Sequence, residues 1–314
     1  MPAHIRGGHL LIGNFDGVHI GHRKMIDCMR ALAGRHRAPV VVMTFEPHPQ
    51  AFVGRTGSFN RLTGMNEKVQ LLTEQGVDDI VIVDFDDDLA ALSQNPFNLE
   101  HLWHHLEPKS VAMGANFQFG HCPVSGADFA TVGRHSGLDI MILSSPIWKG
   151  DVRVTSDYIR SRLMQGDIHT VNHLLGRRWT LRGTVVHGDK RGRELGFPTI
   201  NLAFRSDAHF ALGIYAVRVQ IGGTIANGVA SYGTRPQFDN GPPRLEIHIF
   251  DFDGDLYGSE VLVEFVGFQR SELVFPDVEA LLQQMHVDCA EARRLLGDDM
   301  RDQSIESIRG REFS

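Results

Sequence analysis

"LLIGNFDGVHIGHRKMI", residues 10–26, joins an apolar run to a glycine-containing turn and then to a segment with helical spacing that starts near Val18. This order predicts a buried strand, a turn and a helix, the first half of a strand–helix–strand unit. The first N–H groups of a helix have no partner within it, and the helix dipole adds partial positive charge there. The turn is therefore suited to bind a phosphate group.

Two histidines, His19 and His22, stand one helical turn apart beside this helix end, and Gly21 between them leaves room for a ligand. They could hold a metal ion, act as a general base or bind an anion. A metal pair usually has a spacing of four residues and a carboxylate or third histidine as partner, and neither is evident here. Two half-exposed histidines on an ordinary helix are the alternative that the stretch leaves open.

The chain around this stretch alternates short apolar runs with helical periods as far as about Ser145. Strands are predicted at 9–13, 39–45, 78–85, 109–114 and 138–145, and helices at 19–33, 66–75 and 97–106. Such alternation predicts a parallel sheet with crossover helices, which binds its ligands at the carboxyl ends of its strands. We therefore expect a Rossmann-like α/β domain.

The pattern changes after about Gly176 to strand-like runs separated by Gly, Pro and Asp turns, at 179–188, 213–223, 224–233, 244–252 and 259–268. This pattern predicts an antiparallel β-barrel. A helix is expected at 277–296, and the polar tail 297–314 is expected to be loosely held. With 314 residues the chain exceeds what one core usually organises, so two domains are predicted, 1–176 and 177–314.

The composition of the chain restricts the classes of function that it can have. The net charge of −7 and the pI near 6.2 argue against broad nucleic-acid binding, which needs a basic surface. The three cysteines have no paired or metal-type spacing, which indicates a reduced compartment. No apolar run approaches the length of a membrane span or of a signal peptide. We expect a cytoplasmic protein without membrane or nucleic-acid partners, and a homo-oligomer stays open.

A second motif, "GTVVHGDKRGRELGFPTINL", residues 183–202, joins two strands through a basic loop. Gly188, Gly192 and Gly196 free its backbone to wrap phosphates, and Arg191 and Arg193 supply positive charge. A solvated hairpin with a run of charges is the alternative. Thr199 and Asn201 are two residues apart, so in an extended strand they face the same side and could present two oxygens to Mg²⁺.

"GNFDGVHIGH", residues 13–22, resembles the H-x-G-H nucleotidyltransferase signature of bacterial bifunctional riboflavin kinase/FAD synthetases. Further motifs similar to that family follow in order: "TFEPHP" at 44–49, "RLT" at 61–63, "GANFQFG" at 114–120 and "RVTSDYIR" at 153–160. "GFPTINL" resembles the riboflavin kinase module, and so do 228–238, 245–258 and 263–275. The resemblance covers about 10–296.

The resemblance implies that the N-terminal domain adenylylates FMN with ATP, giving FAD and pyrophosphate. His19 and His22 would then be the catalytic contacts to the triphosphate, and Arg61 and Asn116 would approach the flavin nucleotide. The residues implied in ATP or phosphate binding are Gly13, Asn14, Phe15, Asp16, Gly21, Ser156 and Arg160.

For the C-terminal domain the resemblance implies phosphorylation of riboflavin by ATP, with Glu246 as the base, Arg270 at the flavin, and Mg²⁺ at Thr199 and Asn201. An isolated Glu in a strand is more often a surface residue, so this role rests on the resemblance. The residues implied in ATP binding are Gly183, His187, Gly188, Arg191, Gly192, Arg193, Gly196 and Pro198.

One departure concerns Asp157, which replaces a threonine where the family reads S-S-T before x-I-R. A carboxylate beside a triphosphate is repulsive unless a cation intervenes. Asp157 could instead cap the helix that follows and point away. Three hypotheses therefore stand: a bifunctional enzyme that makes FMN and FAD, a riboflavin kinase with a weakened adenylyltransferase domain, and a flavin-binding regulator or carrier without catalysis.

Overall fold

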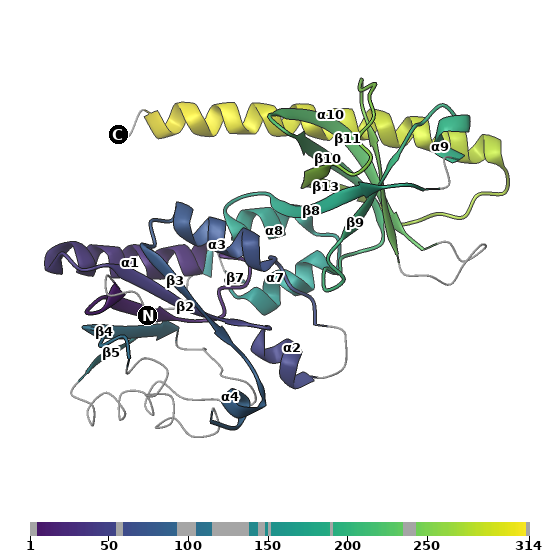
Figure 1. The fold of residues 1–314 in the computed structure, drawn as a ribbon. Coiled ribbons are helices and arrows are strands. Elements are labelled where there is room, and N and C mark those ends of the chain that lie inside the picture. The colour runs from purple at the N-terminus through teal and green to yellow at the C-terminus, as the bar shows by residue number, and fades with distance from the viewer. Residues whose placement is uncertain are drawn as a thin grey trace. The chain divides into compact units, whose positions relative to one another are not determined.

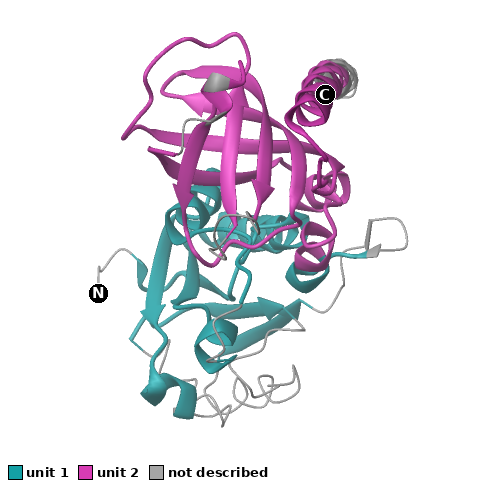
Figure 2. Cartoon of the chain, turned by 90° about the vertical axis from the view of Figure 1, so that its right-hand side faces the viewer, with its two compact units in different colours: residues 1–158 teal, residues 159–314 magenta. Residues whose placement is uncertain are grey.

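The computed structural model describes residues 5–54, 59–92, 105–114, 138–143, 148–149, 152–188, 191–234 and 243–311. By its internal contacts the chain divides into two compact units, Met1–Tyr158 and Ile159–Ser314 (Figure 2). The boundary near 176 marks a change of sequence pattern and stays a prediction.

The described part of the first unit contains a parallel sheet (Figure 1). Its strands are β1 (His9–Ile12), β2 (Val40–Glu46), β3 (Asp79–Asp84), β4 (Ser110–Gly114) and β5 (Asp139–Leu143), in the order β3-β2-β1-β4-β5. Four of the five predicted strand segments contain one of them, and β2 extends one residue beyond its predicted segment, so the predicted α/β fold is confirmed. The strand order reverses at β1, and ligands of such sheets bind outside the carboxyl ends of the strands at this reversal.

Both faces of this sheet are covered by other elements, and successive residues of a strand point to opposite faces. The helices are α1 (Ile20–His36), α2 (Pro49–Gly54), α3 (Met65–Glu74) and α4 (Asp87–Leu92). Leu10 of β1 packs in the apolar cluster that includes Leu89 of α4, whereas Leu11 packs with Ile26 of α1 and Leu72 of α3. Figure 1 shows α1 and α3 on one side of the sheet and α4 on the other.

The helices predicted at 19–33 and 66–75 are present as α1 and α3, and the one predicted at 97–106 lies largely outside the described residues. α1 runs on to His36 and ends at Arg37, whose φ of 49° is left-handed. The sequence pattern does not predict α2 and α4, because six residues are too few to show a helical period.

Two further helices follow, α7 (Ser156–Leu163) and α8 (Ile168–Leu175), and the division between the units falls inside α7. They come after a short antiparallel pair, β6 (Trp148–Lys149) and β7 (Val152–Arg153). Asp167 caps α8 by accepting from the Thr170 N–H at 3.1 Å, and α8 ends at Gly176 with φ of 67°. A glycine in this conformation is a common end of a helix.

The second unit contains a closed antiparallel barrel in the order β10-β11-β12-β9-β8-β13. Its strands are β8 (Trp179–Val186), β9 (Ile200–Phe204), β10 (Gly213–Ile221), β11 (Thr224–Gly233), β12 (Arg244–Ile249) and β13 (Glu260–Arg270). Alternate residues fill its interior, where the ring of Trp179 lies 4.8 Å from Phe265 and 5.2 Å from Phe210, centroid to centroid. The predicted barrel is confirmed, and "GFPTINL" leads into β9.

The helix predicted at 277–296 is α10, but it spans Val278–Arg311. The helix therefore continues past its predicted end at Leu296, and the looseness of the tail stays a prediction. Asp299 in this extension pairs with Arg178 and, at 2.7 Å, with Arg218 of the barrel. These ion pairs follow Ala292 and Leu296 along the helix, which pack in one apolar cluster with Ala216 of β10.

Candidate active sites

The turn between β1 and α1 has an unusual backbone. Phe15, Gly17 and Val18 have φ of 49°, 84° and 37°, and a β-branched residue in this region is an outlier. Such residues cost about 1–3 kcal/mol each and persist where the surroundings fix them. Here Phe15 and Val18 are buried, and the Gly17 N–H donates to Thr63 Oγ1 at 3.1 Å. The turn is therefore held in one form at the carboxyl edge of the sheet.

His19 is the N-cap of α1, and its Nδ1 accepts from the His22 N–H at 3.3 Å. A neutral ring that accepts at Nδ1 carries its proton on Nε2, so His19 can donate from that atom. The rings of His19 and His22 are stacked, with centroids 3.7 Å apart, and Phe15 lies 5.0 Å from His22. Gly21 is buried in the same helical turn. The pair thus presents ring nitrogens beside a helix N-terminus, which suits an anion.

Within the described residues no group of three or more His, Cys, Asp or Glu side chains could hold a metal ion.

Asp16 is nearly fully buried, and its carboxylate accepts hydrogen bonds from "RLT". The donors are the Leu62 N–H and the Thr63 N–H at 3.1 Å, with the Thr63 hydroxyl at 3.3 Å. Ser156, 140 positions away, donates its hydroxyl to the Asp16 carbonyl at 2.8 Å. The structure thus brings three of the motifs together around one turn.

Arg61 forms a two-point ion pair with Glu46 at the end of β2, at 2.7 and 2.9 Å. The Thr44 hydroxyl donates to the Asn14 carbonyl at 3.2 Å, and Lys68 Nζ donates to Thr44 Oγ1 at 3.3 Å. Asn14 Oδ1 is buried without a hydrogen-bond partner among the described residues. A buried acceptor without a donor costs free energy, which favours a donor supplied by a ligand.

The sequence motifs do not single out Glu46 and Lys68 as site residues. The signal for Lys68 is its position on α3, because it stands four residues before Leu72 and shares that buried face. A lysine on an apolar helix face is unusual, because lysine is almost never fully buried unless it is paired. This position therefore indicates a buried charge with a specific role.

Asp157 does not cap α7, because Thr155 Oγ1 accepts the Tyr158 N–H at 3.1 Å. Asp157 is exposed in the first turn of the helix, where a negative charge favours the helix dipole. Arg160 is half-buried on the same helix. Asn116 and most of "GANFQFG" lie outside the described residues.

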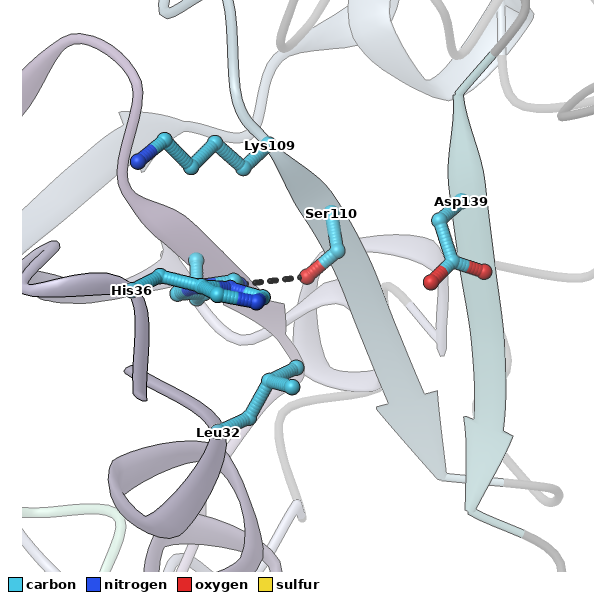
Figure 3. A pocket seen from close by; sticks show the side chains of 6 residues that line it. Leu32, His36, Lys109, Ser110 and Asp139 are labelled. Atoms are coloured by element: carbon cyan, nitrogen blue, oxygen red, sulfur yellow. Dashed lines mark hydrogen bonds between the residues drawn. The ribbon is translucent and has the colours of Figure 1, made fainter. Parts of the chain in front are cut away.

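A cavity of about 300 Å³ lies at the opposite, amino edge of the sheet, lined by His9, Leu32, His36, Lys109, Ser110 and Asp139 (Figure 3). His9 Nδ1 lies 2.7 Å from Ser110 Oγ, and His9 Nε2 lies 3.0 Å from His36 Nδ1. None of the predicted site residues lines this cavity.

The stability of the protein should fall as the pH drops through the range just below 6.5. Burial, with help from His36 and Lys109, lowers the pKa of His9. The unfolded chain therefore binds more protons than the native one in this range, and one such group changes the free energy of unfolding by at most about 1.4 kcal/mol per pH unit. Urea unfolding at pH 7.5, 6.5 and 5.5 would show a shallower loss for His9→Gln than for the exposed-residue control His169→Gln. Equal changes of the unfolding free energy with pH in the two variants would show that His9 is not the group responsible.

In the second unit, Glu246 of β12 stands in register with Asn201 of β9 and Ser231 of β11. Thr199 donates to Glu246 Oε2 at 3.5 Å. Leu245 and Ile247 on either side are buried, so Glu246 lies on the outer face of this strand and is half-buried. The structure thus brings together one carboxylate and two neutral oxygen-bearing side chains.

The glycine-rich loop packs closely against these residues. A Cβ on Gly188 would lie 2.1 Å from Asn201 Nδ2, and one on Gly192 would lie 2.4 Å from the Phe197 carbonyl. Gly196 has φ of 83°, which suits a glycine. Gly183 differs, because it lies within β8, where a Cβ would meet the Ala203 carbonyl of β9 at 2.5 Å. Gly183 is thus close-packed within the sheet.

Other predicted residues of this site lie around the loop. The ring of His187 lies against that of Tyr257 at a tilt of 35°, with centroids 3.8 Å apart, and the Pro198 carbonyl lies 2.8 Å from His248 Nδ1. Arg193 is exposed, and Arg191 begins the short helix α9 (Arg191–Glu194).

Arg270, at the end of β13, forms a two-point ion pair with the buried Asp288 of α10, at 2.8 and 2.6 Å. Its guanidinium therefore fastens the barrel to α10 in this structure.

Both units present groups suited to bind phosphate, as an enzyme that transfers phosphate-containing groups requires. Residues 2–156 match the family model described as FAD synthetase, and residues 175–296 match the one described as riboflavin kinase. The chain belongs to the bifunctional riboflavin kinase/FMN adenylyltransferase family, as its motifs predict.

Two relatives and one solved structure illustrate the match. The bifunctional riboflavin kinase/FMN adenylyltransferase of Escherichia coli (strain K12) is 36% identical over 292 residues, 92% of each chain. That of Bacillus subtilis (strain 168) is 32% identical over 302 residues, 91% of each chain. A crystal structure described as a macrolide-efflux protein from Streptococcus pneumoniae has a TM-score of 0.80 at 28% identity and covers 90% of this chain and 92% of that one.

No helix in the described parts of the chain has the length and apolar character that a membrane span requires.

Proposed function

We propose that the second unit phosphorylates riboflavin to FMN and that the first unit converts FMN to FAD, with ATP as co-substrate of both reactions. The proposed boundary between the catalytic parts lies near residue 176, next to the start of the riboflavin kinase match at 175. The proposed setting is the cytoplasm, in line with the unpaired Cys28 and Cys289.

The kinase assignment is carried by one observation, the contact of Thr199 with Glu246 beside Asn201. The 5′-hydroxyl oxygen of riboflavin forms a bond to the γ-phosphorus of ATP, the bond to the ADP oxygen breaks, and Glu246 takes the hydroxyl proton. Thr199 and Asn201 would offer hard oxygen ligands of the kind that Mg²⁺ prefers. Mg²⁺ held there would neutralise charge on the phosphates.

In the first unit, an oxygen of the FMN phosphate forms a bond to the α-phosphorus of ATP, and pyrophosphate leaves. This reaction needs no protein nucleophile, since alignment and stabilisation of phosphate charge suffice. The cap at His19, the stacked His22 and the fixed turn that holds Gly13, Asn14 and Phe15 support that role. Ser156 supports it through its bond to the turn. Arg61 is proposed to contact the substrates after it leaves its ion pair with Glu46, and Arg160 stays a proposed phosphate contact.

Incubation of the protein with riboflavin, ATP and Mg²⁺, followed by separation of the flavins, tests the proposal. We expect FMN to appear first and FAD to follow. FMN without FAD would leave a kinase with a weakened adenylyltransferase unit, a candidate favoured by the exposed carboxylate of Asp157 in the first turn of α7. Bound flavin without either product would leave a flavin-binding protein.

Gly188→Ala should lower riboflavin phosphorylation at least about tenfold and raise the Mg²⁺ concentration needed for half of the maximal rate. The new methyl group would displace the Asn201 amide, because 2.1 Å is far inside van der Waals contact. The matched control is Gly223→Ala, where a Cβ would have nothing within 4 Å. Equal rates for the two variants would show that the close packing of Gly188 and Asn201 is unimportant to catalysis.

A further inference from the structure

Lys68 carries an ammonium group into the interior of the first unit. Its exposed fraction is 0%, and it is among the largest fully buried side chains of the described residues. Burial lowers the pKa of this lysine to about 8, while the carboxylates of Asp16 and Glu46 act in the opposite direction and Arg61 acts with burial. Burial of an ammonium group lowers the stability of the folded protein. Buried charged groups of this kind are frequent at functional sites, which indicates a functional role for Lys68.

The ammonium is linked to the phosphate-binding turn through one hydroxyl group. Lys68 Nζ donates to Thr44 Oγ1 at 3.3 Å, and Thr44 Oγ1 donates to the Asn14 carbonyl at 3.2 Å. A hydroxyl group has one proton and can accept as well, so both bonds form together. The chain of hydrogen bonds connects α3, β2 and the turn, and it ends at Asn14, whose Oδ1 is buried without a partner among the described residues.

The charges around Lys68 sum to zero only when it is protonated. Arg61 is paired with Glu46, and the carboxylate of Asp16 accepts hydrogen bonds from Leu62 and Thr63. Without the ammonium, two carboxylates would face one guanidinium beneath the turn. A net negative charge there opposes the binding of a triphosphate, and more strongly so in a site of low dielectric constant.

We propose that Lys68 is a positioning residue of the adenylyl-transfer site: through Thr44 it holds Asn14 and the turn in the form that accepts ATP, and it offsets the carboxylates of Asp16 and Glu46. The inference rests on the proposed function of the first unit. It implies that FAD formation needs the protonated lysine and declines as the pH rises through about 8, with Asp16, Glu46 and Arg61 as the charged neighbours that set this range.

The test uses the full chain and measures two rates on each preparation. FMN with ATP and Mg²⁺ reports adenylyl transfer, and riboflavin with ATP and Mg²⁺ reports the kinase reaction as the internal control. Wild type, Lys68→Met, Lys68→Arg and Thr44→Val are compared between pH 6.5 and 9.5. Met has a similar length without charge, whereas Arg stays charged throughout this range. Thermal unfolding of each variant reports its folding.

We expect Lys68→Met to lower kcat/KM for ATP in FAD formation at least about tenfold, with FMN formation unchanged. Lys68→Arg should retain more activity than Lys68→Met and move the alkaline decline to higher pH, and Thr44→Val should lose part of the FAD activity.

Two results would overturn the inference about Lys68 while leaving the proposed function of the first unit intact. One is FAD formation by Lys68→Met at the wild-type rate, and the other is the same alkaline decline in wild type and Lys68→Arg. If Lys68→Met does not fold, the FAD rate of Thr44→Val and the pH profiles of wild type and Lys68→Arg still test the inference. A wild type that makes FMN but no FAD would remove the proposed function, and the inference with it.

Discussion

Glu246→Gln should lower the rate of riboflavin phosphorylation about 100-fold or more while leaving the conversion of FMN to FAD unchanged. The amide has the shape of the carboxylate and can still accept from Thr199, which donates to Glu246 at 3.5 Å. It cannot take the proton of the riboflavin hydroxyl. General base catalysis contributes typically 10²–10⁴-fold, so its loss is large even when binding is preserved.

The matched control for this prediction is Glu260→Gln on β13 of the same barrel. Glu260 is exposed and pairs with Arg182 at 2.8 Å, a surface contact that contributes about 0–1 kcal/mol. Steady-state formation of FMN should therefore be normal in this variant. A Glu246→Gln enzyme with the same kcat as Glu260→Gln would show that Glu246 is not the base, and the carrier hypothesis would then regain weight for the second unit.

The fold could be predicted because both units repeat simple patterns. In β1 the apolar run is continuous, since Leu10 and Leu11 are buried on opposite faces of a parallel sheet. In β8 buried and exposed residues alternate, as in a barrel with one apolar side. The end of α10 could not be predicted in this way, because the ion pairs of Asp299 with Arg178 and Arg218 join residues about 80 to 120 positions apart.

The candidate sites were predictable as motifs but not as contacts. The spacing of Thr199 and Asn201 predicts a common face, and the register of β9 with β12 adds Glu246 to it. By contrast, nothing in a single sequence shows that Arg270 meets Asp288. Charged side chains reach partners across the fold, and only three-dimensional packing selects them.

His22→Ala should lower FAD formation about 100-fold while FMN formation stays normal. His22 stacks on His19 at 3.7 Å beside the N-terminus of α1, where positive charge or ring N–H groups would stabilise charge on the phosphate oxygens. Removal of one preorganised donor costs roughly 10²–10³ in rate at comparable sites. The loss of ring stacking costs only about 1 kcal/mol of stability, so the variant should fold.

The control is Arg35→Ala, an exposed residue in the last turn of the same helix, which removes a basic side chain far along α1 from the turn. Its FAD formation should match the wild type. If His19 and His22 are only histidines on an ordinary helix, His22→Ala and Arg35→Ala should behave alike. Equal FAD rates in the two variants would support that alternative.

The kinetic constants of His22→Ala separate two roles for His22. A higher KM for ATP with an unchanged kcat would mean that His22 binds the ground state and the transition state equally. A lower kcat would mean that His22 stabilises charge that develops only during adenylyl transfer.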